Sequence, residues 1–419
     1  MKTALRAAAL AVCGILLAVS PALAVVPYDT YTYSADGEIA YTTHAYIPEK
    51  IMKNSGTIYG TPLESPRDLF ADAHGSLYIT DTGNNRILEL GADGRPLRII
   101  DRYSWEGAER RFSEPSGLFV TAAGDIYVAD TGNGLVVALD AAGRGKRGLA
   151  RPKTGLLEEE FPYRPVSVAV DRYDRVFVVA SNVTMGVIVF DAKGNFQNFL
   201  GAQRVSYNLT DFLWKQYMTR EQKNRMSQFV PTEYSRLEID SSGFVYAVST
   251  GYDPSDVDAS IRQGARDGRI APIRKLNPSG FDILQRKGYF APVGDIKYGK
   301  TPDGKPRVSA MLDVALGPAG TYTLLDSVYG RIFTYNQRGD LLFAFGAEST
   351  QSGNSLNPCA ISYRGSDLLA LDSVTGNITE YKRTDYGTLL IEAQEKYNNF
   401  DDAGAAAVWK SIIEYNPTA

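Results

Sequence analysis

Residues 66–87 read PRDLFADAHGSLYITDTGNNRI, and residues 115–136 read PSGLFVTAAGDIYVADTGNGLV. The two stretches are copies of one unit. Each has a short alternating strand, a turn that contains glycine, and a second strand that ends in Asp-Thr-Gly-Asn. A third strand, another glycine turn and a fourth strand follow in both copies. Four short strands in a repeat of about 50 residues are typical of one blade of a β-propeller.

Four weaker copies follow the first two. They begin at Pro165, Tyr234, Leu312 and Pro358. The sequence therefore predicts an all-β fold, a six-bladed β-propeller over residues 58–388. Residues 25–57 are rich in tyrosine and alternate in polarity, which predicts a hairpin that closes the ring on the last blade. Over residues 389–419 the periodicity becomes helical and predicts a pair of α-helices.

The first 24 residues have the composition of a secretory signal peptide. Lys2 and Arg6 precede an apolar run, and small residues lead up to Ala24, after which we expect cleavage. The mature protein is thus expected to be secreted or to lie at the cell surface. Its remaining cysteine, Cys359, has no partner for an internal disulfide. No second apolar run is long enough to span a bilayer.

The charge of the chain argues against nucleic acid as a partner. The formal net charge is −4 at pH 7, and removal of Lys2 and Arg6 with the signal makes it more negative. A negative protein lacks the electrostatic attraction to phosphate that supplies most nucleic-acid affinity. We therefore expect a protein partner or a small ligand.

The stretch DTGNNRI at residues 81–87 has the pattern of an NHL repeat. Further stretches, among them NLTDFLW at 208–214, PIRKLNPSG at 272–280 and APVGD at 291–295, resemble a family of exported bacterial NHL proteins. This resemblance covers most of the chain. It implies a propeller followed by a tetratricopeptide-like helical region, often with a C-terminal membrane anchor, and gene neighbours that include components of sugar transporters. A carbohydrate-type ligand and a role in solute uptake follow from it as expectations.

The helical pair at residues 389–419 is similar to a single tetratricopeptide repeat. One repeat cannot bury its own apolar face. We therefore expect the pair to pack on the propeller or to dimerise, or else to begin a longer helical array that the chain cuts short.

The Asp-Thr-Gly-Asn turns are expected to be architecture rather than a binding site. An Asp or Asn side chain can cap its own backbone, and glycine can take a positive φ in a tight turn. No helix follows these glycines, so they do not form a phosphate loop. Cys359 lies at the start of a strand and is expected to be a core residue.

Loop lengths distinguish the two faces of the predicted ring. Turns between first and second strands, and between third and fourth strands, are short in every repeat. The connections between blades and between second and third strands contain all the long insertions, so ligand-binding loops are expected on that face. The insertions are 101–114, 150–164, 201–233, 251–272, 288–310 and 346–357. Segment 208–233 is expected to form two short helices that act as a lid.

Seven residues are candidates for a ligand site at the channel mouth on that face. The first residue of each first strand should face the mouth, and these positions include Asp68, Arg236 and Asp313. An ion pair between Arg236 and Asp313 in a wet channel is the simplest structural alternative. The other four candidates are Arg67, Glu233, Tyr234 and Arg274.

The composition gives little support to catalysis. The chain has two histidines, His44 and His74, and neither is placed near the mouth, so we expect neither a histidine-rich metal site nor a nucleophile with a histidine base. The alternative is a metal-dependent hydrolase or lactonase with Ca²⁺ bound by Asp68 and Asp313, although Arg236 would repel the ion. The favoured interpretation is a binding or scaffolding propeller that has no cofactor and is not an enzyme.

Overall fold

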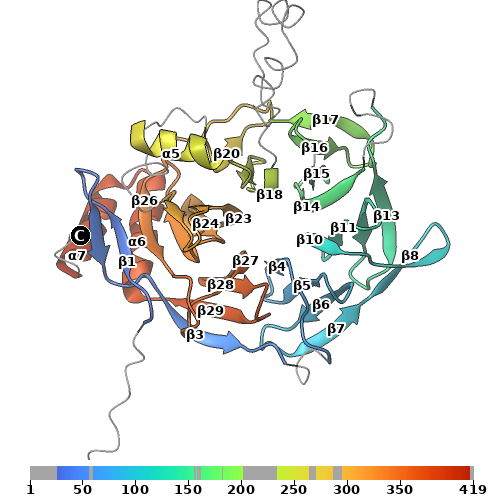
Figure 1. The fold of residues 1–419 in the computed structure, drawn as a ribbon, viewed down its shortest axis with the longest axis horizontal. Helices are drawn as coiled ribbons and strands as arrows, with labels where there is room; N and C mark the ends of the chain where they lie inside the picture. Colours follow the sequence, from blue (N-terminus) through green and yellow to red (C-terminus); the bar gives the residue numbers. More distant parts are fainter. Residues whose placement is uncertain are drawn as a thin grey trace, which may run out of the picture.

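The computed structural model describes residues 26–55, 60–154, 157, 162–181, 183–201, 234–263, 270–285 and 295–415. Six of its sheets are blades arranged around one central axis (Figure 1). The predicted six-bladed β-propeller with a short C-terminal helical pair is confirmed. No described helix is long and apolar enough to cross a membrane.

Blades one to three each contain four antiparallel strands in chain order. Their second and third strands are almost wholly buried, because a neighbouring blade covers each face of the sheet. Blade one consists of β4 (Asp68–Ala71), β5 (Leu77–Asp81), β6 (Arg86–Leu90) and β7 (Pro96–Ile100). Blade two consists of β10 (Pro115–Val120), β11 (Ile126–Asp130), β12 (Leu135–Leu139) and β13 (Gly145–Ala150). Blade three consists of β14 (Arg164–Val170), β15 (Val176–Ser181), β16 (Val187–Phe190) and β17 (Phe196–Leu200).

Blades four to six follow the same order with different outer edges. Blade four has three strands among the described residues: β18 (Tyr234–Ile239), β19 (Val245–Ser249) and β20 (Ile273–Leu276). The four inner strands of blade five are β23 (Met311–Leu316), β24 (Tyr322–Asp326), β25 (Arg331–Tyr335) and β26 (Leu341–Phe345). Blade six begins with β27 (Pro358–Arg364), β28 (Asp367–Asp372) and β29 (Ile378–Arg383).

The N-terminal segment closes the ring. β3 (Tyr46–Met52) is the fourth strand of blade six and pairs with β29, with Met52 opposite Ile378 and Tyr46 opposite Arg383 (Figure 1). The Tyr-rich hairpin forms from β1 (Thr30–Tyr33) and β2 (Ile39–Thr42), but it extends blade five through β26. The expectation that this hairpin closes the last blade is therefore wrong, because the next strand, β3, occupies that edge.

The two C-terminal helices pack on the propeller. α6 (Asp385–Asn398) begins directly after β29, with the Thr384 hydroxyl capping the Gly387 amide, and α7 (Asp402–Tyr415) folds back on it. Tyr386, Leu390 and Ile412 share a core with the aromatic residues of blade five. The Asn398 side chain also donates to the Ala319 carbonyl, in η1 (Pro318–Gly320) between β23 and β24. Of the arrangements expected for the pair, the structure shows this docked one.

The long insertions add small elements to one side of the blades. The 101–114 insertion is a hairpin of β8 (Arg102–Trp105) and β9 (Ala108–Arg111), and a second hairpin consists of β21 (Tyr298–Lys300) and β22 (Pro306–Val308). α5 (Pro254–Gln263) lies in the 251–272 insertion and buries Val257 in the core beside blades four and five. The expected lid helices at 208–233 lie outside the described residues.

The Asp-Thr-Gly-Asn turns tie neighbouring blades together. Asp81 accepts from the Arg86 guanidinium at 2.6 Å and from the Glu64 amide at 2.8 Å, and Thr82 donates to the Pro115 carbonyl of blade two. The positive φ expected at the motif glycine lies instead at Asn85, with φ 54°. Gly83 is required for a different reason: a Cβ there would lie 2.7 Å from the Glu64 carbonyl oxygen. The turns therefore have a structural role, and their glycine is needed because the neighbouring backbone lies too close to allow a side chain.

Candidate functional site

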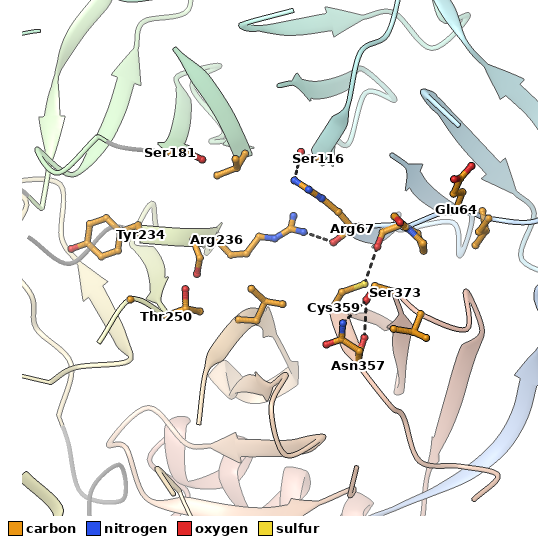
Figure 2. Close-up of a pocket in the computed structure, with 18 residues that line it drawn as sticks. Glu64, Arg67, Ser116, Ser181, Tyr234, Arg236, Thr250, Asn357, Cys359 and Ser373 are labelled. Atoms are coloured by element: carbon orange, nitrogen blue, oxygen red, sulfur yellow. Dashed lines mark hydrogen bonds between the residues drawn. The ribbon is translucent and has the colours of Figure 1, made fainter. Parts of the chain in front are cut away.

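A cavity of about 1050 Å³ opens at one end of the central channel (Figure 2). Its outer wall comes from the connections between blades and from the ends of second strands. Residues of this outer wall include Leu63, Glu64, Ser65, Ser181, Thr250, Gly251, Asn357, Ser373 and Val374. The long insertions belong to the same two kinds of connection, between blades and between second and third strands, and Gly251 and Asn357 lie within them. The cavity therefore opens on the face predicted to bear the ligand-binding loops, which we call the insertion face.

A ring of six side chains forms the inner wall of the cavity, one from each blade. Its members are Arg67, Ser116, Val166, Ser235, Leu312 and Cys359. In five blades this residue lies at a register shift where the first strand meets the second, as between Pro115 and Gly117 opposite β11. A β-bulge leaves one residue unpaired and re-aims its side chain. In these five blades the bulge explains why this position faces the mouth.

The seven candidate residues fall into four groups. Arg67, Tyr234 and Arg236 line the cavity. Asp68 and Asp313 lie one position deeper than the ring and are buried between blades. Arg274 is on β20, the third strand of its blade, where it lies 3.4 Å from Asp282, so it does not reach the mouth. Glu233 lies outside the described residues.

Arg236 is the centre of a buried polar network under the mouth. Its Nη1 lies 2.7 Å from Asp68 Oδ2, and both side chains are about nine-tenths buried. Its Nη2 donates to the Arg67 carbonyl across the channel (Figure 2). The expected pairing of Arg236 with Asp313 is therefore corrected: the direct partner is Asp68. Asp313 acts on Arg236 through its charge.

The buried carboxylates also satisfy the inner edges of neighbouring blades. Asp68 Oδ2 accepts from the Leu118 amide at 2.8 Å, and Asp313 Oδ2 accepts from the Ile361 amide at 2.8 Å. Glu238 Oε2 accepts in the same way from the Leu316 amide at 2.6 Å. First strands have no strand partner on the channel side, so these amides need side-chain acceptors. Asp68 and Asp313 thus join blades, which is a structural role.

Burial of these acids changes their protonation. Burial raises the pKa of Glu238 to about 8, against the lowering effect of the Leu316 amide and with the repulsion of Asp313 and Asp68. Burial also raises the pKa of Asp313 to about 7, against the lowering effect of Arg236 and with the repulsion of Asp68. At neutral pH Glu238 and Asp313 therefore keep part of their protons in the folded protein.

Substitution of Glu238 by glutamine tests this protonation. Folding raises the pKa of Glu238 from 4.5 to about 8. Between these pH values the folded protein binds one proton that the unfolded chain has released, so the free energy of unfolding falls as pH rises toward 8. Glutamine removes this loss. We expect Glu238→Gln to gain about 2 kcal/mol relative to wild type between pH 5 and pH 9, less than the full shift because the side chain is half-buried.

Denaturant unfolding at pH 5, 7 and 9 measures this gain. Glu38→Gln makes the same chemical change in the exposed turn between β1 and β2 and should follow the wild type at every pH. Parallel pH profiles for wild type and Glu238→Gln would show that Glu238 is already ionised in the folded protein at pH 5.

None of the described residues of the cavity wall is an activated nucleophile. The Cys359 thiol donates to the Pro66 carbonyl at 3.3 Å, and burial raises the pKa of that thiol far above its usual range. His44 lies beside Thr30 in the N-terminal segment, and His74 lies in a short turn on the other face. Thus no described histidine is available as a base for Cys359 or for the serines of the wall.

The described residues also offer no metal cage. Nowhere in the described ranges do three His, Cys, Asp or Glu side chains form a group that could hold a metal ion. The oxygen site considered for Asp68 and Asp313 would have to displace Arg236 from Asp68, and both carboxylates already accept backbone amides. A divalent cation at this position would lie against a guanidinium.

The sequence contained a signal for the ring that the repeat alignment did not use. Four of the six ring residues directly follow a proline: Arg67, Ser116, Val166 and Cys359. Proline within a sheet is confined to edges, strand starts and bulges. In these four repeats the residue after the proline faces the channel, and in three of them, blades two, three and six, the proline marks the bulge.

Residues 112–139, which include β11 and β12, match the family model of the NHL repeat. No curated protein matches the sequence. Among solved structures, a streptogramin B lyase aligns over 82% of this chain and 100% of its own, with 10% identity and a TM-score of 0.46.

Two further solved structures are similar to the same extent. An inactive variant of virginiamycin B lyase from Staphylococcus aureus, crystallised with quinupristin, aligns over 80% of this chain and 99% of its own, with 10% identity and a TM-score of 0.48. A protein of unknown function from Bacteroides thetaiotaomicron aligns over 84% and 90%, with 10% identity and a TM-score of 0.47. At these values the likeness carries no argument about function.

Proposed function

We propose that this propeller with an NHL repeat is a non-catalytic binding protein that holds a small polar ligand in its channel mouth, outside the cytoplasm. The cavity of about 1050 Å³ supports the proposal most directly, because its volume matches the upper range of small-molecule sites. Its position on the insertion face adds to this support. The expected export rests on the features of residues 1–24.

Binding accounts for the wall better than catalysis does. The carboxylates under the mouth are engaged with Arg236 and with backbone amides, and the thiol of Cys359 is buried and protonated. A general acid or base must reach the substrate with a free polar atom. Among the described wall residues, the groups that offer such atoms are hydroxyls, the Asn357 amide, the Arg67 guanidinium and one rim carboxylate, Glu64, which has no described histidine beside it in the wall.

The wall chemistry suits a carbohydrate-type ligand. Hydroxyl and amide side chains alternate around the mouth with small apolar ones. The polar neutral members are Ser65, Ser116, Ser181, Ser235, Thr250, Asn357 and Ser373, and the aliphatic members include Leu63, Val166, Leu312 and Val374. Sugar hydroxyls need both donors and acceptors, and sugar C–H faces need apolar contact. A sugar ligand also agrees with the link to solute uptake that the family resemblance implies.

A bulky residue in the ring tests the location of the site. Val166 is a ring residue that is only half-buried, so Val166→Trp should fill part of the mouth with little effect on the core. We expect wild type to bind members of an array of neutral and acidic oligosaccharides, and Val166→Trp to weaken each confirmed interaction at least about tenfold. Calorimetry with the strongest array member measures the loss.

Tyr173→Trp provides the matched control in the same blade. Tyr173 is 62% exposed in the short turn between β14 and β15, on the opposite face. Its replacement should leave binding unchanged. Equal binding by Val166→Trp and wild type would place the ligand elsewhere, and a wild-type protein that binds no sugar but is crosslinked through this face to a protein partner would replace the proposal with a docking function.

A further inference from the structure

We infer that the mouth is selective for anionic sugars and that Arg67 is the residue that binds their charged group. This inference rests on the proposed function and narrows its ligand class. The anionic group is a carboxylate, sulfate or phosphate on a polyhydroxylated ligand, since each presents two or more oxygens to a guanidinium.

Arg67 is the cation of the ring. The other ring residues are Ser116, Val166, Ser235, Leu312 and Cys359, all uncharged at neutral pH. The Arg67 side chain is exposed, and its described contact is a long hydrogen bond of 3.4 Å from Nη1 to the Ser116 hydroxyl. No carboxylate within the described residues forms a salt bridge with it. Its charge is therefore available to a ligand.

The two guanidinium groups at the mouth differ in this respect. Arg236 is 7% exposed and is compensated by Asp68 at 2.7 Å. Arg67 is exposed at the cavity wall, and its backbone carbonyl accepts from Arg236 of this pair. A cation in the wall of a concave site adds to the attraction of an anion, because a cleft concentrates the field of the charges that line it.

The backbone that supports Arg67 is fixed at several points. The Pro66 carbonyl accepts from the Cys359 thiol, the Arg67 carbonyl accepts from Arg236, and the Arg67 amide donates to the Thr80 carbonyl at 3.2 Å. A side chain on a fixed backbone loses less entropy when it binds a ligand. The buried network beneath the mouth thus positions the residue that we assign to recognition.

The surroundings of the guanidinium fit a sugar with one anionic substituent. In Figure 2 Arg67 points toward Ser116 at the inner side of the cavity, and Glu64, the carboxylate at the rim, lies on the far side of Arg67. Ser116 and Ser235 place hydroxyls in the same ring, where they can meet sugar hydroxyls. Val166 and Leu312 supply apolar contact.

The experiment compares matched ligands and matched variants. The ligands are trigalacturonate, a sulfated galactose trimer, a galactose trimer with a phosphate substituent and neutral galactotriose, each titrated against the full-length mature protein by calorimetry. We expect one or more of the anionic trimers to bind at least about tenfold more tightly than galactotriose, and the anionic trimers separate carboxylate from sulfate from phosphate as the preferred group. Arg67→Ala should weaken the anionic interaction by about 10- to 100-fold, the range for a hydrogen bond to a charged group.

Two control variants separate charge from position and geometry. Arg95→Ala removes the same charge from an exposed turn on the opposite face of blade one and should leave affinity unchanged. Arg67→Lys keeps the charge but not the planar fork and should recover part of the affinity. A higher salt concentration should weaken the binding of anionic trimers to the wild type and have little effect on the residual binding of these trimers to Arg67→Ala.

The outcomes distinguish this inference from the proposed function. If galactotriose binds as well as the anionic trimers, Val166→Trp abolishes that binding and Arg67→Ala does not change it, the mouth is a sugar site and the anion selectivity is wrong. Absence of binding by all four trimers also overturns the selectivity. Loss of anionic binding in Arg95→Ala to the same extent as in Arg67→Ala would attribute the effect to overall charge.

Discussion

Replacement of Arg236 by alanine is expected to lower the free energy of unfolding by about 3–5 kcal/mol, the cost of breaking a buried ion pair by removal of one partner. Asp68 would lose its partner at 2.7 Å, and Asp313 would lose the positive charge that lowers its pKa. Two acids would then remain buried without a cation. Denaturant unfolding near neutral pH measures the loss, and Arg95→Ala, exposed on the opposite face, should change stability by less than about 0.5 kcal/mol.

The loss should depend on pH in a defined direction. Without Arg236 the pKa values of both acids rise further, so the folded protein retains protons that the unfolded chain releases above pH 4. Arg236→Ala should therefore be closest to wild type at pH 5 and furthest from it at pH 9. The double variant Arg236→Met with Asp68→Asn removes both charges and should recover more than half of the loss. A double variant no more stable than Arg236→Ala would show that packing, and not unpaired charge, is the cause.

The repeat pattern was sufficient to predict the fold because the same pattern of strands and turns occurs in every blade. Strand, turn and strand recur in residues 66–87 and 115–136, and the weaker copies need only their alternating cores to be recognised. Neighbouring blades cover both faces of each sheet, which is why β5 and β11 are buried at every position. Such burial leaves few alternative arrangements for the chain.

The site was harder to predict because it depends on one residue of register. Asp68 and Asp313 lie at the first position of their strands in the alignment, yet the preceding residues, Arg67 and Leu312, line the mouth, and at Leu312 a bulge turns the side chain that way. A shift of one residue moves a side chain to the opposite face of a strand. The sequence shows that Arg67 precedes Asp68 but not that it faces the mouth, and nothing in the sequence position of Arg274 shows that two strands separate it from the channel.

The closure of the ring involves contacts that no repeat encodes. β3 comes from the start of the chain and pairs with β29 near its end, and the Tyr46 ring stacks on Phe345 of blade five with centroids 5.7 Å apart. Its hydroxyl donates to the Ser366 carbonyl at 3.0 Å. The alternating tyrosines indicated a strand pair at this edge. Which strand would join blade five and which would join blade six depends on this tertiary packing.

Replacement of Tyr46 by alanine is therefore expected to cost about 3–5 kcal/mol, as for other large aromatic side chains removed from a core. Tyr46 is 1% exposed and also packs against Phe343, so the variant leaves a cavity where the two ends of the chain meet. Tyr46→Phe keeps the packing and loses the hydrogen bond to Ser366, which should cost only about 1 kcal/mol. Tyr41→Ala, at a residue 62% exposed on β2, should change the free energy of unfolding by less than about 0.5 kcal/mol.

Hydrogen exchange shows where the loss from Tyr46→Ala arises. If β3 fastens the ring, the amides of β3 and β29 should exchange faster in this variant, while those of β15 and β16 in blade three, on the opposite side of the ring, keep most of their protection. This pattern would mean that the ring opens first where the chain ends meet. Uniform loss of protection in all six blades would instead mean that the ring unfolds as one cooperative unit and that its closure has no separate role, since every blade would then depend equally on every other.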